Sequence, residues 1–247
     1  MQIFETIDST QTESKRQIDI KCKIVQDVIF TYEQTNGVST KANFPWNTKR
    51  GDMNYTAIWN IEELQKHGSV LINHITFCVG CAIYDTLKDI DRTLNIQLKW
   101  PNDILIISKK DGVARKLSGV LSEVYKGHFL MGNGMNILHY PAHTEHFLAT
   151  SLLEETGKKF DCYEIFKSIF EKVEKNISIL QKNGFEPIKD MWKKHAYGLG
   201  GTLLLRDNRE VTFEDIDDNG NIVARKPDNE QQIIISSDEI ITGNKKC

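Results

Sequence analysis

A short polar corner interrupts an apolar run near the middle of the chain, within the stretch LKWPNDILII. The corner holds a lysine, an amide and a carboxylate close together, as Lys99, Asn102 and Asp103. A fixed cation can stabilise negative charge that develops on a reacting group, and a carboxylate can orient or accept a proton. On its own the motif would be interpreted as a polar surface turn, because turns favour proline, asparagine and aspartate.

Two motifs downstream favour a site instead. The stretch RKLSGVLSE places Lys116 at the start of a strand and Gly119 three residues later, and MGNGMN ends a strand with two alternating glycines and Asn136. Glycines within a strand let a ligand approach the backbone, and an asparagine amide can both donate to and accept from a planar base. Together the three motifs predict a ligand pocket on a sheet.

Two other clusters have spacings that suit metals or redox chemistry. Cys78 and Cys81, in CVGC, lie in an apolar helical stretch with no second ligand pair, so we expect them to pack in the core. His139, His143 and His146, in HYPAHTEH, have no neighbouring set of carboxylates or cysteines, so we expect a solvated loop and no metal held by the protein.

The hydrophobic pattern indicates the elements that must position these residues. Strands are predicted at MQIFETID, DVIFTYEQT and MNYTAIWNI, with a long polar loop over 36–52 and a helix over 68–87. Four strands joined by tight turns follow, and such turns predict antiparallel pairing: NIQLKW, DILIIS, KLSGVLSEVY and HFLMGNGMNIL.

The last third of the chain changes from helices to short strands. Apolar spacing predicts a helix over 161–180, ended by Gly184, and a second helix at EPIKDMWKKHAY. Four short strands then follow at TLLLR, EVTFEDID, NIVARK and QQIIIS. We therefore expect an α/β body over 1–197 and a small β-barrel over 198–247.

Composition restricts the functional class. The chain has 247 residues, 40% of them hydrophobic, and a net charge of -3, so it lacks the overall basic charge typical of nucleic-acid or anionic-membrane binding. The amino terminus has no apolar signal sequence, and the longest apolar stretch is too polar to cross a bilayer. Five cysteines, an odd number, favour a reducing compartment. We expect a cytoplasmic protein with no nucleic-acid or membrane partner.

The motifs resemble those of the biotin protein ligases. The stretches IDST, EQTNG, KWPND, RKLSGVLSE and GNGMN occur in the order and at about the spacings of that family, and TSLLEETGKKFD, NGFEPIKDMW and DIDDNGNIV extend the resemblance over nearly the whole chain. The resemblance implies an α/β (α+β) catalytic domain like that of class II aminoacyl-tRNA synthetases, with a mixed, mainly antiparallel sheet. It also implies a C-terminal SH3-like β-barrel.

The resemblance implies a reaction in two steps. Biotin attacks the α-phosphate of ATP to give biotinyl-5′-adenylate and pyrophosphate, and a lysine of a biotin carboxyl carrier domain then attacks the acyl carbon. ATP with Mg²⁺ and biotin are the expected substrates, the carrier domain is the expected partner, and a homodimer is left open. Activation is needed because a free carboxylate does not acylate an amine in water, and the charge that develops must meet fixed cations.

Matched position by position, the resemblance assigns roles to individual residues. Lys116 is expected to contact the biotin carboxyl and the α-phosphate, and Asp103 to orient or deprotonate the incoming lysine. The expected biotin-binding residues are Ser9, Thr10, Gln34, Gly37, Lys116, Gly119, Leu121 and Gly134. The expected ATP-binding or adenylate-binding residues are Lys99, Asn102, Gly132, Asn136 and Lys41.

One loop departs from the family pattern. The family has a loop rich in glycine and arginine that ends in a tryptophan, whereas this chain reads GVSTKANFPW, with Thr40 at an arginine position and Trp46 one place late. Lys41 would supply a displaced cation. Two alternatives therefore stay open, a biotin-binding pseudoenzyme and a lipoate-type protein ligase, although the RRxSGGG motif of lipoate ligases is absent. Because IDST begins at Ile7, a preceding DNA-binding domain is disfavoured.

Overall fold

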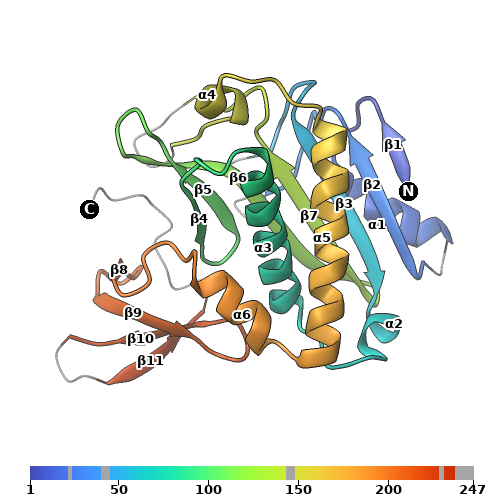
Figure 1. Ribbon diagram of the computed structural model, residues 1–247. Helices are drawn as coiled ribbons and strands as arrows, with labels where there is room; N and C mark the ends of the chain where they lie inside the picture. Colours follow the sequence, from blue (N-terminus) through green and yellow to red (C-terminus); the bar gives the residue numbers. More distant parts are fainter. Residues whose placement is uncertain (22–23, 40–44, 143–147, 228–230, 237–247) are drawn as a thin grey trace.

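A seven-stranded mixed sheet lies at the centre of the fold (Figure 1). The computed structural model describes residues 1–21, 24–39, 45–142, 148–227 and 231–236. The first neighbouring pair across the sheet is parallel and each later pair is antiparallel, as expected for a mixed, mainly antiparallel sheet. The strands run across it in the order β1 (Gln2–Phe4), β2 (Gln26–Thr31), β3 (Met53–Asn60), β7 (His128–Met135), β6 (Ala114–Tyr125), β5 (Asp103–Ile107) and β4 (Ile96–Lys99).

Helices cover the two faces of this sheet unequally. The long helices α3 (Ile72–Ile90) and α5 (Cys162–Asn183) lie side by side on one face, and α1 (Thr10–Lys21) packs on β2, β3 and β7 (Figure 1). Because alternate residues of a strand face opposite sides, two apolar clusters form. The larger includes Phe30, Tyr55 and Phe166. The smaller lies under α1 and consists of Ile18, Ile24, Ile29, Ile58 and Leu130.

The helix ends show which sequence signals were reliable. The helix predicted over 161–180 is α5, which begins after Asp161 and ends at Gly184. Asp161 caps it by accepting the backbone N–H groups of Tyr163 and Glu164, and Gly184 has a φ of 78° that favours glycine. The helix predicted over 68–87 begins only at Ile72, because Gly68 has a φ of 148° and Leu71 is extended. The short helices α2 (Ile61–Gln65), α4 (Leu152–Thr156) and α6 (Glu186–Lys193) complete the body.

Strands β4 to β7 form the predicted antiparallel meander, but one of them is irregular. The pairing of β5 with β6 shifts between Ile104, which lies opposite Ser118, and Leu105, which lies opposite Lys116. Leu117 is therefore an extra residue, a β-bulge that reverses the facing of the residues before it. Leu117 is fully buried in the larger apolar cluster.

The C-terminal strands form a separate antiparallel sheet. Its order is β11 (Gln232–Ile235), β10 (Ile222–Arg225), β9 (Glu210–Ile216) and β8 (Thr202–Leu204). The turn between β9 and β10 rests on the body: Trp100 Nε1 donates to the Gly220 carbonyl at 2.8 Å, and His74 Nε2 donates to the Asp218 carbonyl at 2.9 Å. Trp100 belongs to the polar corner, so the small sheet supports that corner through the bond between Trp100 and Gly220.

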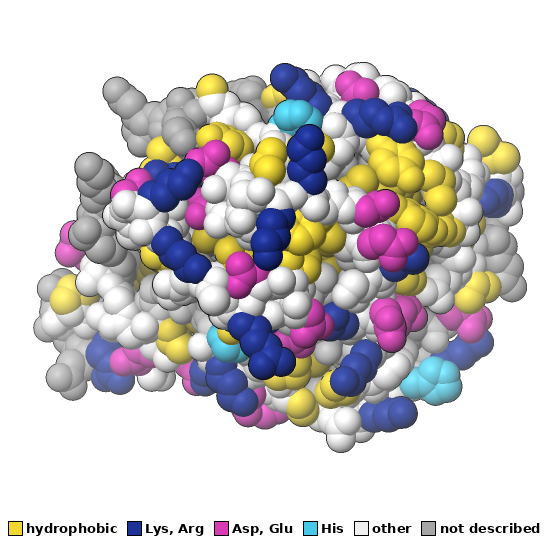
Figure 2. All heavy atoms as spheres, turned by 45° about the horizontal axis from the view of Figure 1, so that its top comes forward, with side chains coloured by type: hydrophobic (Ala, Val, Ile, Leu, Met, Phe, Trp, Pro, Cys, Tyr) yellow, Lys and Arg dark blue, Asp and Glu magenta, His cyan; other side chains and the backbone are white. Residues whose placement is uncertain are grey.

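The charge on the face shown in Figure 2 and the helices do not identify a class of partner. Figure 2 shows Lys and Arg side chains interspersed with Asp and Glu over the face it presents. No helix in the described parts of the chain is long and apolar enough to cross a membrane.

Candidate active site

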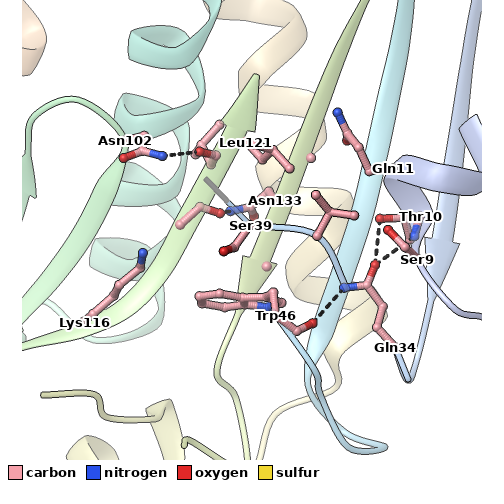
Figure 3. A pocket seen from close by; sticks show the side chains of 15 residues that line it. Ser9, Thr10, Gln11, Gln34, Ser39, Trp46, Asn102, Lys116, Leu121 and Asn133 are labelled. Atoms are coloured by element: carbon pink, nitrogen blue, oxygen red, sulfur yellow. Dashed lines mark hydrogen bonds between the residues drawn. The ribbon is translucent and has the colours of Figure 1, made fainter. Parts of the chain in front are cut away.

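A cavity of about 50 Å³ opens on the α1 side of the sheet, between the start of α1 and strands β6 and β7 (Figure 3). Nine predicted site residues contribute to its lining: Ser9, Thr10, Gln34, Asn102, Lys116, Gly119, Leu121, Gly132 and Gly134. Six residues that the sequence reasoning did not assign to the site also line it: Gln11, Val38, Ser39, Trp46, Val120 and Asn133.

Glycines from two neighbouring strands make the floor. Gly119 of β6 lies directly opposite Gly134 of β7. A Cβ on Gly134 would lie 2.1 Å from Trp46 Nε1, and one on Gly132 would lie 2.9 Å from Gln11 Oε1. A side chain at Gly134 would displace the Trp46 ring, so that position requires glycine for space and not for backbone freedom, whereas at Gly132 only the movable end of Gln11 would have to shift.

The α1 end of the cavity is polar and carries a network of hydrogen bonds. Gln34 Oε1 accepts from the backbone N–H of Thr10 at 2.8 Å and from its hydroxyl at 3.0 Å. Gln34 Nε2 donates to the Trp46 carbonyl at 3.2 Å and to Asn54 Oδ1 at 3.3 Å. Ser9 Oγ accepts the Thr12 N–H at 3.4 Å, at the N-terminus of α1. The polar end thus ties the covering loop to the helix.

The opposite end carries a charged pair. Lys116 Nζ and Asp103 Oδ1 form a salt bridge, and their side chains are 18% and 21% exposed. The bulge explains why Lys116 is here: with regular alternation from Gly119 it would face the α3 side, and the extra Leu117 returns it to the cavity side. A Cβ on Gly119 would lie 2.9 Å from Lys116 Nζ, so the glycine floor continues beneath the pair.

Trp46 covers the middle of the cavity. Lys116 Nζ lies 5.4 Å from the centroid of its ring, within cation–π range. Its Nε1 atom is buried and has no hydrogen-bond partner among the described residues. The Trp46 N–H donates to the Gly37 carbonyl at 2.9 Å, so Gly37 closes the base of the loop and does not line the cavity. A buried, unpaired donor facing a cavity suits a ligand with an acceptor.

Four predicted residues lie outside the lining, and one lies outside the described chain. Lys99 and Asp103 belong to a smaller hollow beside β4 and β5, although Asp103 reaches Lys116. Asn136 is buried, and its Nδ2 donates to the Thr150 carbonyl at 3.0 Å, so its amide supports the backbone around Lys116. Lys41 lies outside the described residues, so its position stays a prediction.

The cysteine pair and the histidine cluster noted in the sequence can be placed only in part. Cys78 and Cys81 are buried in the larger apolar cluster, and burial raises the pKa of both thiols, which disfavours the reactive thiolate. His139 lies beside Asp52. His143 and His146 lie outside the described residues.

Family models match both parts of the chain. The model described as the biotin/lipoate A/B protein ligase family matches residues 3–138, and the model described as the biotin protein ligase C-terminal domain matches residues 202–238.

Individual relatives agree with these matches. The bifunctional ligase/repressor BirA of Bacillus subtilis is 31% identical over 131 residues, which is 51% of this chain and 40% of that protein. The biotin--[acetyl-CoA-carboxylase] ligase of Paracoccus denitrificans is 28% identical over 185 residues, 71% of this chain and 75% of the relative. The chain thus spans less than half the length of the BirA relative.

A solved structure has the same fold along nearly the entire chain. The biotin protein ligase from Aquifex aeolicus in complex with biotin and ATP superimposes with a TM-score of 0.77 at 21% identity, covering 97% of this chain and 96% of that one.

Proposed function

Since the chain belongs to the biotin/lipoate A/B protein ligase family, we propose that it is an ATP-dependent biotin protein ligase. It activates biotin as biotinyl-5′-adenylate and transfers the biotinyl group to a lysine of a biotin carboxyl carrier domain. One observation carries the proposal: the Lys116–Asp103 pair stands at one end of a glycine-floored cavity whose other end is built by Thr10 and Gln34. The match of the C-terminal strands to the biotin protein ligase domain favours biotin over lipoate.

In the first step, a carboxylate oxygen of biotin attacks the α-phosphorus of ATP, and the bond to pyrophosphate breaks. Both reacting groups are anionic, so their approach requires a fixed cation. Lys116 Nζ provides it, because the bulge directs it into the cavity and Asp103 holds it there before substrates arrive. Loss of one such donor at developing charge typically costs about 10²- to 10³-fold in rate.

In the second step, the carrier lysine attacks the acyl carbon and AMP leaves. A lysine amine with an ordinary pKa of about 10.4 is almost wholly protonated at neutral pH. Asp103 is the carboxylate next to the reacting centre, and it accepts this proton or aligns the amine once Lys116 contacts the phosphate.

The remaining predicted residues divide between the two substrates. Ser9, Thr10 and Gln34 take the ureido ring of biotin, whose polar edge needs paired donors and acceptors. Gly119, Leu121 and Gly134 provide close backbone and apolar contact with biotin, and Gly37 assists by closing the base of the loop that covers the cavity. Lys99, Asn102, Gly132, Asn136 and Lys41 serve the ATP or adenylate side.

Mg²⁺ enters with ATP as part of the substrate. Within the described residues no group of three or more His, Cys, Asp or Glu side chains is placed to hold a metal. Mg²⁺ in such reactions is commonly held by one or two carboxylates together with substrate phosphates, and Asp103 offers a carboxylate at the phosphate end.

The proposal extends to organisation and location. Residues 1–197 form the catalytic domain and 198–247 the C-terminal domain, and the acceptor belongs to a biotin-dependent carboxylase. A cytoplasmic location is supported by Cys78, Cys81 and Cys162, which are buried and unbonded.

Pyrophosphate release tests the proposal. The protein is incubated with MgATP and either biotin or lipoate, and then with a biotin carboxyl carrier domain and its acceptor-lysine→Arg variant. We expect pyrophosphate with biotin alone, and biotin attached to the carrier but not to its variant. Release with lipoate would indicate a lipoate ligase, and biotin binding without pyrophosphate would indicate a pseudoenzyme.

A further inference from the structure

Asp52 is a buried carboxylate that the proposed chemistry does not use. It is 2% exposed and directly precedes β3, at the end of the segment that carries Trp46. A charged group at such a position is costly unless its oxygens are hydrogen-bonded. Its partners therefore indicate what it is for.

The hydrogen bonds of Asp52 Oδ1 come from one distant segment. It accepts the backbone N–H groups of Ile137 at 3.0 Å, Leu138 at 2.9 Å and His139 at 3.0 Å. Three consecutive N–H groups that converge on one anionic oxygen hold the backbone in a curl. His139 Nδ1 lies 3.3 Å from Oδ2 but is not aligned for a hydrogen bond, so the backbone bonds carry this contact.

A second observation shows that the two segments are pressed together. Gly51 has a φ of 104°, and a Cβ built on it would lie 2.4 Å from Leu138 Cδ1. The Asp52 N–H donates to the Lys49 carbonyl at 3.1 Å and closes a tight turn. The turn thus packs Gly51 against the Leu138 side chain and directs the Asp52 carboxylate at the backbone of 137–139.

The clamped segment continues directly from the region around Lys116. Residues 137–139 follow Asn136, whose N–H donates to the Leu117 carbonyl at 2.9 Å. The backbone of Lys116 is paired in turn with Leu148 and Thr150, at 2.9 Å each. The carboxylate therefore fixes the path of the chain where it leaves β7, beside the cation of the site.

The polar end of the cavity is held differently. The Thr48 hydroxyl accepts from the Gln34 N–H at 3.0 Å and from Asn54 Nδ2 at 2.8 Å, and the Asp52 carboxylate reaches this segment only through one long bond, from the Lys49 N–H to Oδ2 at 3.5 Å. Loss of that carboxylate should therefore affect one end of the site and spare the other.

We propose that Asp52 is a positioning residue for the nucleotide side of the site. The inference rests on the proposed function, which places ATP beside Lys116 and Asn136. By holding 137–139 in its curl, Asp52 keeps that side arranged for ATP before ATP binds, so less of the binding free energy is lost to ordering.

The test is Asp52→Asn, which keeps the size of the side chain but leaves a weaker acceptor. Calorimetry measures the affinity for biotin and, with biotin present, for a non-hydrolysable ATP analogue. We expect the nucleotide dissociation constant to rise about tenfold, equivalent to about 1.4 kcal/mol, and the biotin constant to change less than about twofold. Hydrogen exchange should become faster at 137–139.

Asp161→Ala is the matched control. It removes the cap of α5 and lowers thermal stability, and the hydrogen bonds of that cap come from Tyr163 and Glu164 and not from 137–139, so both affinities should hold. If Asp52→Asn does not fold, Gly51→Ala perturbs the same contact and should give the same split. Unchanged nucleotide affinity, or equal loss for both ligands, overturns the inference. Failure of the proposed function would be seen separately, as a wild-type protein that binds both ligands and releases no pyrophosphate.

Discussion

Replacing Gly134 by alanine would test whether the covering loop sits on the glycine floor. A Cβ at this position lies 2.1 Å from Trp46 Nε1 and 2.4 Å from its Cε2. Non-bonded heavy atoms are comfortable at about 3.5–4.0 Å, so the indole must retreat by more than about 1 Å. The retreat strains the Gln34 bond to the Trp46 carbonyl, at 3.2 Å, and the Trp46 bond to Gly37, at 2.9 Å. Such overpacking costs about 1–3 kcal/mol, and because the loop must be seated to cover bound biotin, this free energy is expected to lower biotin affinity by about 5- to 150-fold.

Biotin titration by calorimetry measures the effect, with Gly80→Ala as the matched control. Gly80 lies in α3, and its Cβ would meet Trp192 at an ordinary 3.6 Å. Alanine also favours a helix by up to about 1 kcal/mol over glycine. The control should bind biotin normally and melt at the same or a higher temperature, whereas Gly134→Ala should lose affinity. If Gly134→Ala binds biotin as tightly as the wild type, the indole does not rest on the floor in solution.

Three further outcomes are expected. Lys116→Ala should slow pyrophosphate release at least about 100-fold while biotin affinity falls by only about tenfold, because ground-state contacts are worth less; wild-type release would remove Lys116 from the reaction. Asp103→Asn should still form biotinyl-adenylate, detected by mass spectrometry, but transfer it slowly to the carrier, and equal loss in both steps would make Asp103 structural. Burial lowers the pKa of His74 below its ordinary 6.5, so the unfolded chain binds that proton more readily and stability is lost as pH falls below that value. Melting temperatures measured between about pH 7.5 and about pH 5.5 should fall less steeply in His74→Gln, and an identical slope would assign the effect to other groups.

Local patterns sufficed to predict much of the frame. Tight turns between alternating runs predicted the β4–β7 meander, and the apolar spacing over 161–180 with Gly184 after it predicted α5 and its end. The family motifs predicted most of the cavity lining, including the three glycines of the floor, Gly119, Gly132 and Gly134. Each of these signals depends on residues that are close together in the chain or belong to a motif of fixed spacing.

What could not be predicted depends on long-range contacts. No residue pattern in RKLSGVLSE indicates a β-bulge at Leu117, yet the bulge determines that Lys116 faces the cavity side of the sheet. Asp52 gains its partners 85 to 87 residues further along the chain, so no local pattern identifies it. Gln11 directly follows the quoted IDST motif and could have been included, because it lies in the first turn of the helix that begins at the last residue of the motif.

The seating of the 217–220 turn on the body limits how this protein can be recombined with its relatives. Trp100 and His74 donate to backbone carbonyls, so these two bonds depend on the backbone conformation of the turn and not on its side chains. That shape needs Gly220, which has a φ of 82° and whose Cβ would lie 3.2 Å from Asn73. A chimera that takes its C-terminal sheet from a relative would therefore keep the polar corner around Trp100 in place only if the donor turn matched in length and in the position of its glycine. The 217–220 turn and the Trp100 and His74 side chains that bond to it must therefore come from the same parent protein. A chimera joined between the two sheets would separate them.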